Sequence, residues 1–373
     1  MRWAFWAAVF LIAYTYAGYL GWLWLRSRWR PCPVHSRIFE PFVSIVMVVR
    51  DEQGVLEAKI RNLLRLDYPE DRMELVIVSD GSSDRTEAIL REQARHPRLL
   101  TVLNQLPRGK ASGLNDGLQI ARGEVVVFTD ARQEIEASAL RLLLNNFGDP
   151  KVGCVSGELM LGDPQAGEKS RDMGLYWTME KKVREFESAS GSVVGATGAF
   201  YGVRRELLGV IPDETLLDDV YVPMEVVRAG KRVVFEPRAR AWDVAHQGIG
   251  REFSRKVRTL TGNYQLLQIA PWLLSAANPI RFEFVSHKLL RLVVPFALLV
   301  ALLASGFLPQ PFYRIAFTLQ LVFYALSLVR MTQVKWGPLA RLGDVSLTFV
   351  MLNTAAVVAF ANFVTQRKVV WSR

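Results

Sequence analysis

Apolar and polar positions divide the chain into a central part that alternates and two ends that are continuously apolar. Between about residues 42 and 235, apolar runs of strand length alternate with amphipathic stretches of helix length. The run at 43 to 49 is typical of a buried strand, and residues 56 to 66 space their apolar side chains at helical intervals. Strands that alternate with helices predict an α/β domain with a mostly parallel sheet.

A first apolar run lies at residues 3 to 25, and three basic residues follow it (Arg26, Arg28, Arg30). At about 1.5 Å per residue of helix, this run is long enough to cross a hydrocarbon core of about 30 Å. Because the stronger basic flank lies behind the run, the pattern favours a membrane helix over a cleaved signal peptide. The positive-inside rule places the following residues in the cytoplasm, so we expect an integral protein of the cell inner membrane.

Three more apolar runs lie near the C-terminus, at residues 289 to 308, 312 to 329 and 345 to 364. Each is close to the length that a membrane span requires. Basic residues place the loop between the last two runs inside (Arg330, Lys335, Arg341). If all three runs crossed the membrane, the basic C-terminal tail would lie outside, against the positive-inside rule. One of the three runs is therefore either a full span or a re-entrant or interfacial segment.

These patterns predict four parts of the chain. Residues 1 to 30 form an N-terminal membrane helix with its basic flank, and residues 31 to 263 form the cytoplasmic α/β domain. Residues 264 to 288 are amphipathic and predict helices that lie in the membrane interface. Residues 289 to 373 form a C-terminal membrane region.

Composition agrees with a membrane protein. Of the 373 residues 50% are hydrophobic, and the formal net charge is +10. The arginines lie at membrane flanks and no basic groove with stacking aromatics is apparent, so we expect membrane lipid and not nucleic acid as a partner. The two cysteines, Cys32 and Cys154, suggest neither a disulfide framework nor a metal site. Cys32, beside the membrane, is either an unmodified or an acylated thiol.

Acidic residues follow two of the predicted strands. Asp80 ends the apolar run before Gly-Ser-Ser-Asp84, and Asp130 follows the run at 125 to 128. In open parallel sheets, ligands bind beyond the carboxyl ends of the strands, so these acids lie where a nucleotide-binding crevice is expected. The alternative is a turn followed by a helix N-cap at Asp84.

Five motifs occur in order: Val-Ser-Ile-Val-Met-Val-Val-Arg-Asp-Glu at 43 to 52, Asp80-Gly-Ser-Ser-Asp84, Gly109-Lys110, Asp130 and Leu217-Asp218-Asp219. With this set the chain resembles glycosyltransferase family 2 from about residue 42 to 288. It is most similar to the membrane-bound branch that includes cellulose, hyaluronan and poly-N-acetylglucosamine synthases. The resemblance implies a GT-A fold with a Rossmann-like, mostly parallel sheet. It also implies a nucleoside diphosphate sugar donor, usually uridine-linked, and Mg2+ or Mn2+ as cofactor.

The donor-side residues follow from the same resemblance. Asp80 matches the aspartate that holds the nucleobase, and Asp51 or Glu52 matches the acidic position near the nucleoside; the alternative for all three is turn chemistry and solvation. Lys110 begins a predicted helix, where a cation and free backbone N–H groups can meet phosphate or uracil oxygens. Its alternative is a solvated surface charge.

Asp130 matches the first aspartate of the family's Asp-x-Asp metal motif, but the third position here is Arg132. An arginine cannot ligate Mg2+ or Mn2+. Either Asp130 binds the metal with water and diphosphate completing the shell, or Arg132 supplies positive charge itself. Arg132 is otherwise a surface residue at a helix start.

Asp219 matches the last residue of the family's Thr-Glu-Asp motif, at the start of a predicted helix over 220 to 228. The resemblance implies that it is the general base of an inverting transfer, which removes the proton of the acceptor hydroxyl. Asp218, just before it, has an alternative role as the N-cap of that helix.

Processive members of the family carry Gln-x-x-Arg-Trp near the membrane, where this chain has Arg255-Lys256-Val257-Arg258. The resemblance leaves Arg258 as a contact to diphosphate, but the missing glutamine and tryptophan argue against processive polymer synthesis. These basic residues are equally a helix face on anionic lipid. His246 and His287 are isolated histidines, for which structural or solvated roles are more typical than metal ligation.

Together these features predict an inverting glycosyltransferase that uses a polysaccharide or a lipid-linked glycan as acceptor. About four membrane helices leave little material for a polymer conduit unless chains associate, so a homo-oligomer is one expectation. The alternative of another class is a catalytically inactive membrane scaffold or export subunit that retains the fold, which only the altered Asp-x-Asp motif supports.

Overall fold

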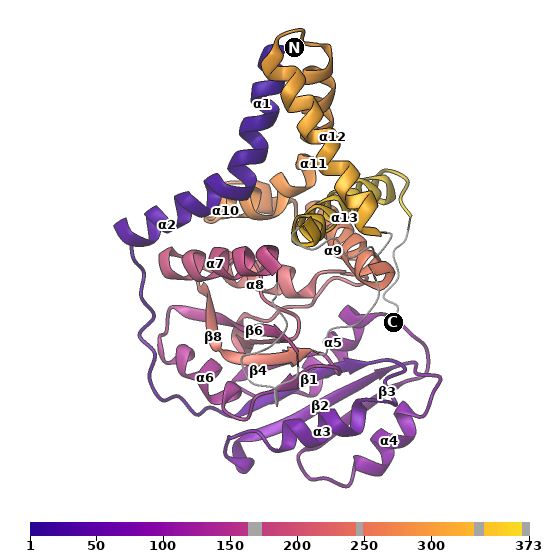
Figure 1. The fold of residues 1–373 in the computed structure, drawn as a ribbon. Coiled ribbons are helices and arrows are strands. Elements are labelled where there is room, and N and C mark those ends of the chain that lie inside the picture. Colours follow the sequence, from indigo (N-terminus) through magenta and orange to yellow (C-terminus); the bar gives the residue numbers. More distant parts are fainter. Residues whose placement is uncertain (163–173, 244–248, 332–338, 368–373) are drawn as a thin grey trace.

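The computed structural model describes residues 1–162, 174–243, 249–331 and 339–367. In this part of the chain, a sheet of eight strands has the order β3-β2-β1-β4-β7-β6-β8-β5 (Figure 1). The strands are β1 (Val43–Val49), β2 (Met73–Asp80), β3 (Leu99–Asn104), β4 (Val125–Thr129), β5 (Glu134–Ile135), β6 (Val152–Leu161), β7 (Phe200–Arg204) and β8 (Arg232–Asp243).

Four neighbouring strands are parallel, because β1 pairs in parallel with both β2 and β4, and β2 with β3. β7 is antiparallel to both β4 and β6, while β6 and β8 are parallel to each other. Every residue of β1, β2 and β4 is buried, as expected for parallel strands that are covered on both faces. The mostly parallel α/β sheet predicted from the sequence is confirmed.

Helices cover both faces of the sheet. Apolar residues of α3 (Leu56–Leu64), α4 (Thr86–Gln93) and α6 (Ala139–Asn145) share one core with the sheet. Those of α5 (Lys110–Ile120), α8 (Asp218–Arg228) and α9 (Ile249–Ile269) share the other. The carboxyl ends of the parallel strands are left for loops, and the candidate site lies there.

Four helices in the described part of the chain are long and apolar enough to cross a membrane: Arg2–Trp29, Arg281–Phe307, Pro311–Arg330 and Leu342–Val364. The first comprises α1 (Arg2–Ala13), η1 (Tyr14–Gly18) and α2 (Tyr19–Trp29). The second comprises α10 (Arg281–Phe284), η7 (Val285–Leu289) and α11 (Leu290–Phe307), and the last two are α12 (Pro311–Met331) and α13 (Leu339–Val364). Exposed apolar side chains along them, such as Leu299 and Leu319, suit contact with lipid.

The structure differs from the sequence prediction between residues 249 and 289. α9 begins before the predicted amphipathic segment, and the helix of the next span starts at Arg281, ahead of the apolar run. Polar residues in the first two turns of this helix are buried, among them Glu283 and His287. Hydropathy depends on apolar residues alone, so it does not register the polar turns that precede the apolar run.

α7 (Gly174–Ser190) separates the sheet from the membrane helices. Figure 1 shows it between the strands and the helices α2 and α10. Val183 of α7 packs with Tyr19 and Leu23 of the first membrane helix, and Phe186 packs against this group. The N-terminal membrane helix and the α/β domain are therefore joined by side-chain packing as well as by the linker.

Candidate active site

Three of the predicted acids lie at one edge of the sheet, where parallel strands end. Asp51 follows β1, Asp80 is the last residue of β2, and Asp130 follows β4. β1 is hydrogen-bonded between β2 and β4, so the three acids occupy neighbouring strand ends. The topology therefore gathers them as the sequence predicts.

Asp80 is fully buried and holds the loop before α5. Its Oδ1 accepts a hydrogen bond from the Arg108 amide at 2.7 Å, and its Oδ2 accepts one from the Gly109 amide at 2.9 Å. Gly109 has a φ of +95°, which favours glycine at this position. In this conformation Asp80 positions the backbone around Lys110, and its contact with a nucleobase stays a prediction.

Asp51 connects the loops that follow β1 and β2. Its Oδ1 accepts hydrogen bonds from the Ser83 amide at 2.7 Å and the Ser83 hydroxyl at 3.0 Å. The bond from the Ser83 amide is the main reason that the pKa of Asp51 is lowered. Beside it, the Glu52 amide donates to the Thr86 hydroxyl at 2.9 Å.

Asp84 belongs to the turn before α4, one residue ahead of the helix N-cap, Arg85. Its Oδ1 accepts from the Thr86 amide at 2.8 Å, at the first turn of α4. The Asp80-Gly-Ser-Ser-Asp84 motif is therefore a hydrogen-bonded turn that leads into a helix, and this turn also fixes the carboxylate of Asp51.

Lys110 joins three elements at the centre of the site. Its Nζ lies 3.0 Å from Asp130 Oδ1 and 3.3 Å from Asp218 Oδ1, and its side chain is only 17% exposed. Burial alone would lower the pKa of Lys110, but the carboxylates of Asp130, Asp218 and Asp219 outweigh it and raise the pKa. Lys110 is thus a half-buried, charged group between two carboxylates, and its contact with phosphate or uracil oxygens stays a prediction.

Asp218 and Asp219 form the first turn of α8, two residues earlier than the predicted helix. Asp218 is buried and accepts from the Tyr201 hydroxyl at 3.4 Å. Asp219 is half-buried, and its Oδ2 accepts from the Gly198 amide at 3.1 Å. Burial and the charge of Asp218 raise the pKa of Asp219 to about 6, against the opposite effects of Lys110 and Lys288.

Asp130 is the one carboxylate of this group with substantial exposure, at 40% of its side chain. Within the described ranges, no cluster of three or more His, Cys, Asp or Glu side chains is suited to a metal. Mg2+ in phosphate-transferring sites is commonly held by one or two carboxylates together with substrate phosphates and water. The exposed Asp130 carboxylate fits that arrangement, and the exposed Arg132 lies beside it.

The sequence prediction missed a buried lysine, Lys59, which contacts residues on either side of Asp130 in the sequence. Lys59 is 3% exposed and donates to the Thr129 hydroxyl at 3.0 Å and to the Gln133 carbonyl at 2.6 Å. Burial lowers the pKa of Lys59 to about 7. The available signal was its place on the apolar face of α3, beside Leu56, Ile60 and Leu63.

Two other predicted residues lie apart from this group. Arg258 is half-buried on α9 and is not among the ion-pair partners of Lys110, Asp130 or Asp218 in the described chain. His287 is buried at the foot of a membrane helix. His246 lies outside the described residues.

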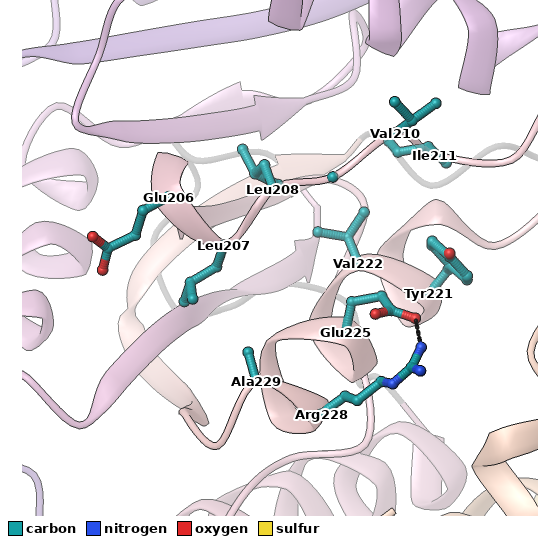
Figure 2. A pocket seen from close by; sticks show the side chains of 11 residues that line it. Glu206, Leu207, Leu208, Val210, Ile211, Tyr221, Val222, Glu225, Arg228 and Ala229 are labelled. Atoms are coloured by element: carbon teal, nitrogen blue, oxygen red, sulfur yellow. Dashed lines mark ion pairs between the residues drawn. The ribbon is translucent and has the colours of Figure 1, made fainter. Parts of the chain in front are cut away.

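A pocket of about 460 Å³ opens on the other side of α8, between that helix and residues 206–211 (Figure 2). Tyr221, Glu225 and Arg228 line it, and Glu225 pairs with Arg228 at 3.5 Å. None of the strand-end acids lines this pocket, so it is separate from the group around Lys110.

The sequence is similar to known glycosyltransferases. Residues 44–211 match the family model for glycosyl transferase family 2. Poly-beta-1,6-N-acetyl-D-glucosamine synthase of Staphylococcus epidermidis is 27% identical over 234 residues, which cover 60% of this chain and 55% of the relative. A synthase of the same name from Staphylococcus aureus (strain MW2) is 26% identical over 234 residues, with the same coverage of both chains. The matched part is thus about half the length of these curated relatives.

A solved structure shares the fold across nearly the whole chain. The mannosyltransferase PcManGT from Pyrobaculum calidifontis, in complex with GDP-Man and Mn2+, gives a TM-score of 0.76 at 23% sequence identity. The match covers 98% of this chain and 100% of that one, so it includes the membrane helices as well as the sheet. The predicted GT-A architecture with apolar helices at both ends is confirmed.

Proposed function

We propose that this chain, whose residues 44–211 match the family model for glycosyl transferase family 2, transfers a sugar, with inversion, from a UDP-sugar to a polysaccharide or lipid-linked glycan at the cytoplasmic membrane face. The observation that carries this proposal is the group formed by Lys110, Asp130 and the Asp218-Asp219 pair at the ends of parallel strands. A catalytically inactive scaffold has no physical need for such an ionic group at the strand ends, which favours the enzyme over the scaffold, and the altered Asp-x-Asp motif stays the one feature that supports the scaffold.

Asp219 is the proposed general base. With a pKa of about 6, it is mostly deprotonated at neutral pH and more basic than an ordinary aspartate. It accepts the proton of the acceptor hydroxyl while that oxygen attacks the anomeric carbon. The new bond joins the acceptor oxygen to this carbon, and the bond from the carbon to the diphosphate oxygen breaks on the opposite face.

Lys110 is the proposed stabiliser of the leaving diphosphate. Its cation stands at the start of α5, where backbone N–H groups add positive potential. Asp80 holds the preceding amides in place, so the charge is fixed before the substrate arrives. Asp130 is the residue that would hold Mg2+ or Mn2+, which when bound adds further positive charge at the diphosphate.

The membrane arrangement supports a cytoplasmic site. The first candidate span ends in a turn that contains Arg26 and Arg28, and the α/β domain follows it. The site then lies on the side where nucleotide sugars occur, and an acceptor reaches it from the membrane or the cytosol. The short membrane region favours a lipid-linked glycan, or a polymer made by associated chains.

The test is sugar transfer by the purified full chain from radiolabelled UDP-N-acetylglucosamine, UDP-glucose and GDP-mannose, with Mg2+, Mn2+ or EDTA. We expect transfer from a UDP-sugar and a loss of at least about tenfold in EDTA, because Lys110, which is already paired with Asp130 and Asp218, neutralises the diphosphate incompletely without a metal ion. Product extracted into organic solvent identifies a lipid-linked acceptor, and product at the chromatographic origin identifies a polymer. Full activity in EDTA would contradict the metal role of Asp130, and transfer from GDP-mannose alone would contradict the donor class.

The raised pKa of Asp219 predicts the pH dependence of transfer. A base must be deprotonated to act, so kcat should fall about tenfold per pH unit below a limb near pH 6. An aspartate at its ordinary pKa would place this limb close to pH 4. Measurement of kcat at saturating donor from pH 4.5 to 8 distinguishes these cases, with nucleotide binding at each pH as the control for folding.

A further inference from the structure

A buried histidine connects the membrane helices to α7. His287 lies at the foot of the second membrane helix and is 1% exposed. Its Nδ1 is 2.8 Å from Glu187 Oε1, and its Nε2 is 2.9 Å from Glu180 Oε1. Both glutamates belong to α7, which lies between the sheet and the membrane helices in Figure 1.

Glu180 brings a negative charge to this contact. A neutral imidazole has a single N–H, so hydrogen bonds to two carboxylates require either the imidazolium or one protonated glutamate. The pKa of Glu180 lies well below its ordinary value, because Arg291 and His287 outweigh the effect of its burial. Arg291 Nη1 donates to Glu180 Oε2 at 2.6 Å. Glu180 is therefore ionised.

Glu187 extends this contact in two directions. Its Oε1 also accepts from the Tyr19 hydroxyl of the first membrane helix, at 2.7 Å. Its Oε2 accepts from the amide of Val194 at 3.2 Å. One buried carboxylate thus joins both ends of the membrane region to the loop at residues 193–198.

The 193–198 loop holds the proposed base. The Ala196 amide donates to the Asp219 carbonyl at 2.6 Å, and the Gly198 amide donates to Asp219 Oδ2 at 3.1 Å. Gly195 has a φ of +100°, and a Cβ there would lie 3.1 Å from a methyl group of Val220. This loop is therefore shaped around the first turn of α8 and leaves little freedom for Asp219.

We propose that Glu187 and His287 are positioning residues, which fix the 193–198 loop against the membrane helices so that Asp219 is held at the reacting geometry. The inference rests on the proposed role of Asp219 as base. The donor side has its own supports, since Asp51 is held by the loop that follows β2 and Asp80 by the loop that follows β3. Loss of the Glu187–His287 contact should therefore lower kcat and leave the KM for the nucleotide sugar unchanged.

The experiment uses the full chain in detergent or nanodiscs and compares Glu187→Gln, His287→Gln and the double variant. A displacement of about 1 Å at a reacting group can lower a rate about a hundredfold, so we expect kcat to fall by about tenfold to a hundredfold. The donor KM should stay within about twofold. The double variant should be no slower than the slower single variant, because all three lose one shared contact.

Hydrogen exchange gives a readout that needs no substrate. The amides of Val194, Ala196 and Gly198 are held by the contacts just described, so their exchange should accelerate at least about tenfold in each variant. Peptides from β1 and β2 should be unchanged. Glu283→Gln is the matched control, since Glu283 is buried on the same membrane helix and pairs with Arg26 but, within the described residues, makes no hydrogen bond to the 193–198 loop.

The outcomes separate this inference from the proposed function. If Asp219→Asn retains full transfer, the role of Asp219 fails whatever the other variants do. If Asp219→Asn is inactive while Glu187→Gln and His287→Gln retain wild-type kcat and exchange, the positioning role alone is wrong. Equal effects of Glu283→Gln on kcat and exchange would also contradict it, since they would indicate a general loosening of the membrane junction.

Discussion

Replacement of Asp219 by asparagine is expected to lower kcat for sugar transfer by about a thousandfold or more. A general base contributes typically about 10²–10⁴ to a rate, and an amide cannot accept a proton at neutral pH. The asparagine Oδ1 still accepts from the Gly198 amide, so the backbone around α8 should keep its conformation. The dissociation constant of the nucleotide should change less than about threefold, measured by calorimetry on the same preparation.

The control for this variant is Asp213→Asn. Asp213 lies just before α8, and its Oδ1 accepts from the Ser112 hydroxyl at 2.8 Å. The Asp213→Asn variant therefore removes an aspartate from the same segment but leaves the ion pairs of Lys110 with Asp130 and Asp218 in place. Asp213→Asn should retain transfer within about twofold. A normal rate in Asp219→Asn would assign the base to another group, and Asp218 would be the first candidate.

Replacement of Lys110 by methionine is expected to lower kcat/KM by at least about a hundredfold. Loss of one preorganised group that stabilises a developing charge typically costs about 10²–10³ in rate. The variant also leaves Asp130 and Asp218 without their shared cation, and their repulsion opens the site. Transfer and nucleotide binding on the purified chain measure the two effects separately.

Two further variants, one that keeps the charge and one control, test this prediction. Lys110→Arg keeps the charge in a longer, planar group and should recover part of the lost rate. Lys231→Met is the matched control, because Lys231 precedes β8 at the opposite edge of the sheet and donates to the Pro150 carbonyl at 3.0 Å. An active Lys110→Met, with transfer within about threefold of wild type, would exclude Lys110 as a stabiliser of the leaving group.

The fold was predictable because its signals are local. Apolar runs mark β1, β2 and β4, and the parallel arrangement alone places Asp51, Asp80 and Asp130 at one edge. The position of Lys110 at the start of a helix was predictable as well, since Gly109 marks the boundary. Its partners were not, because β4 and α8 are distant in sequence and no periodicity specifies which side chains meet.

Local sequence patterns could not predict which polar side chains are buried. Lys59 resembles an ordinary polar interruption of a helix, and His287 an isolated histidine beside a membrane. Each is stable inside the protein because distant residues supply hydrogen bonds, and only the tertiary structure shows those partners. The hydrogen bonds of Asp80 to the backbone of Arg108 and Gly109 were hidden for the same reason.

The antiparallel strand β7 has a consequence for how this enzyme type can diversify. Its first residue, Phe200, pairs with Thr129 at the end of β4, so the loop that precedes β7 arrives at the edge where β1, β2 and β4 finish. The loops after β1, β2 and β4 and the loop before β7 therefore lie at the same edge of the sheet. They come from separate segments of the sequence. Substitutions in the 193–198 loop can therefore change the surroundings of Asp219 while the loops that hold Asp51 and Asp80 stay as they are.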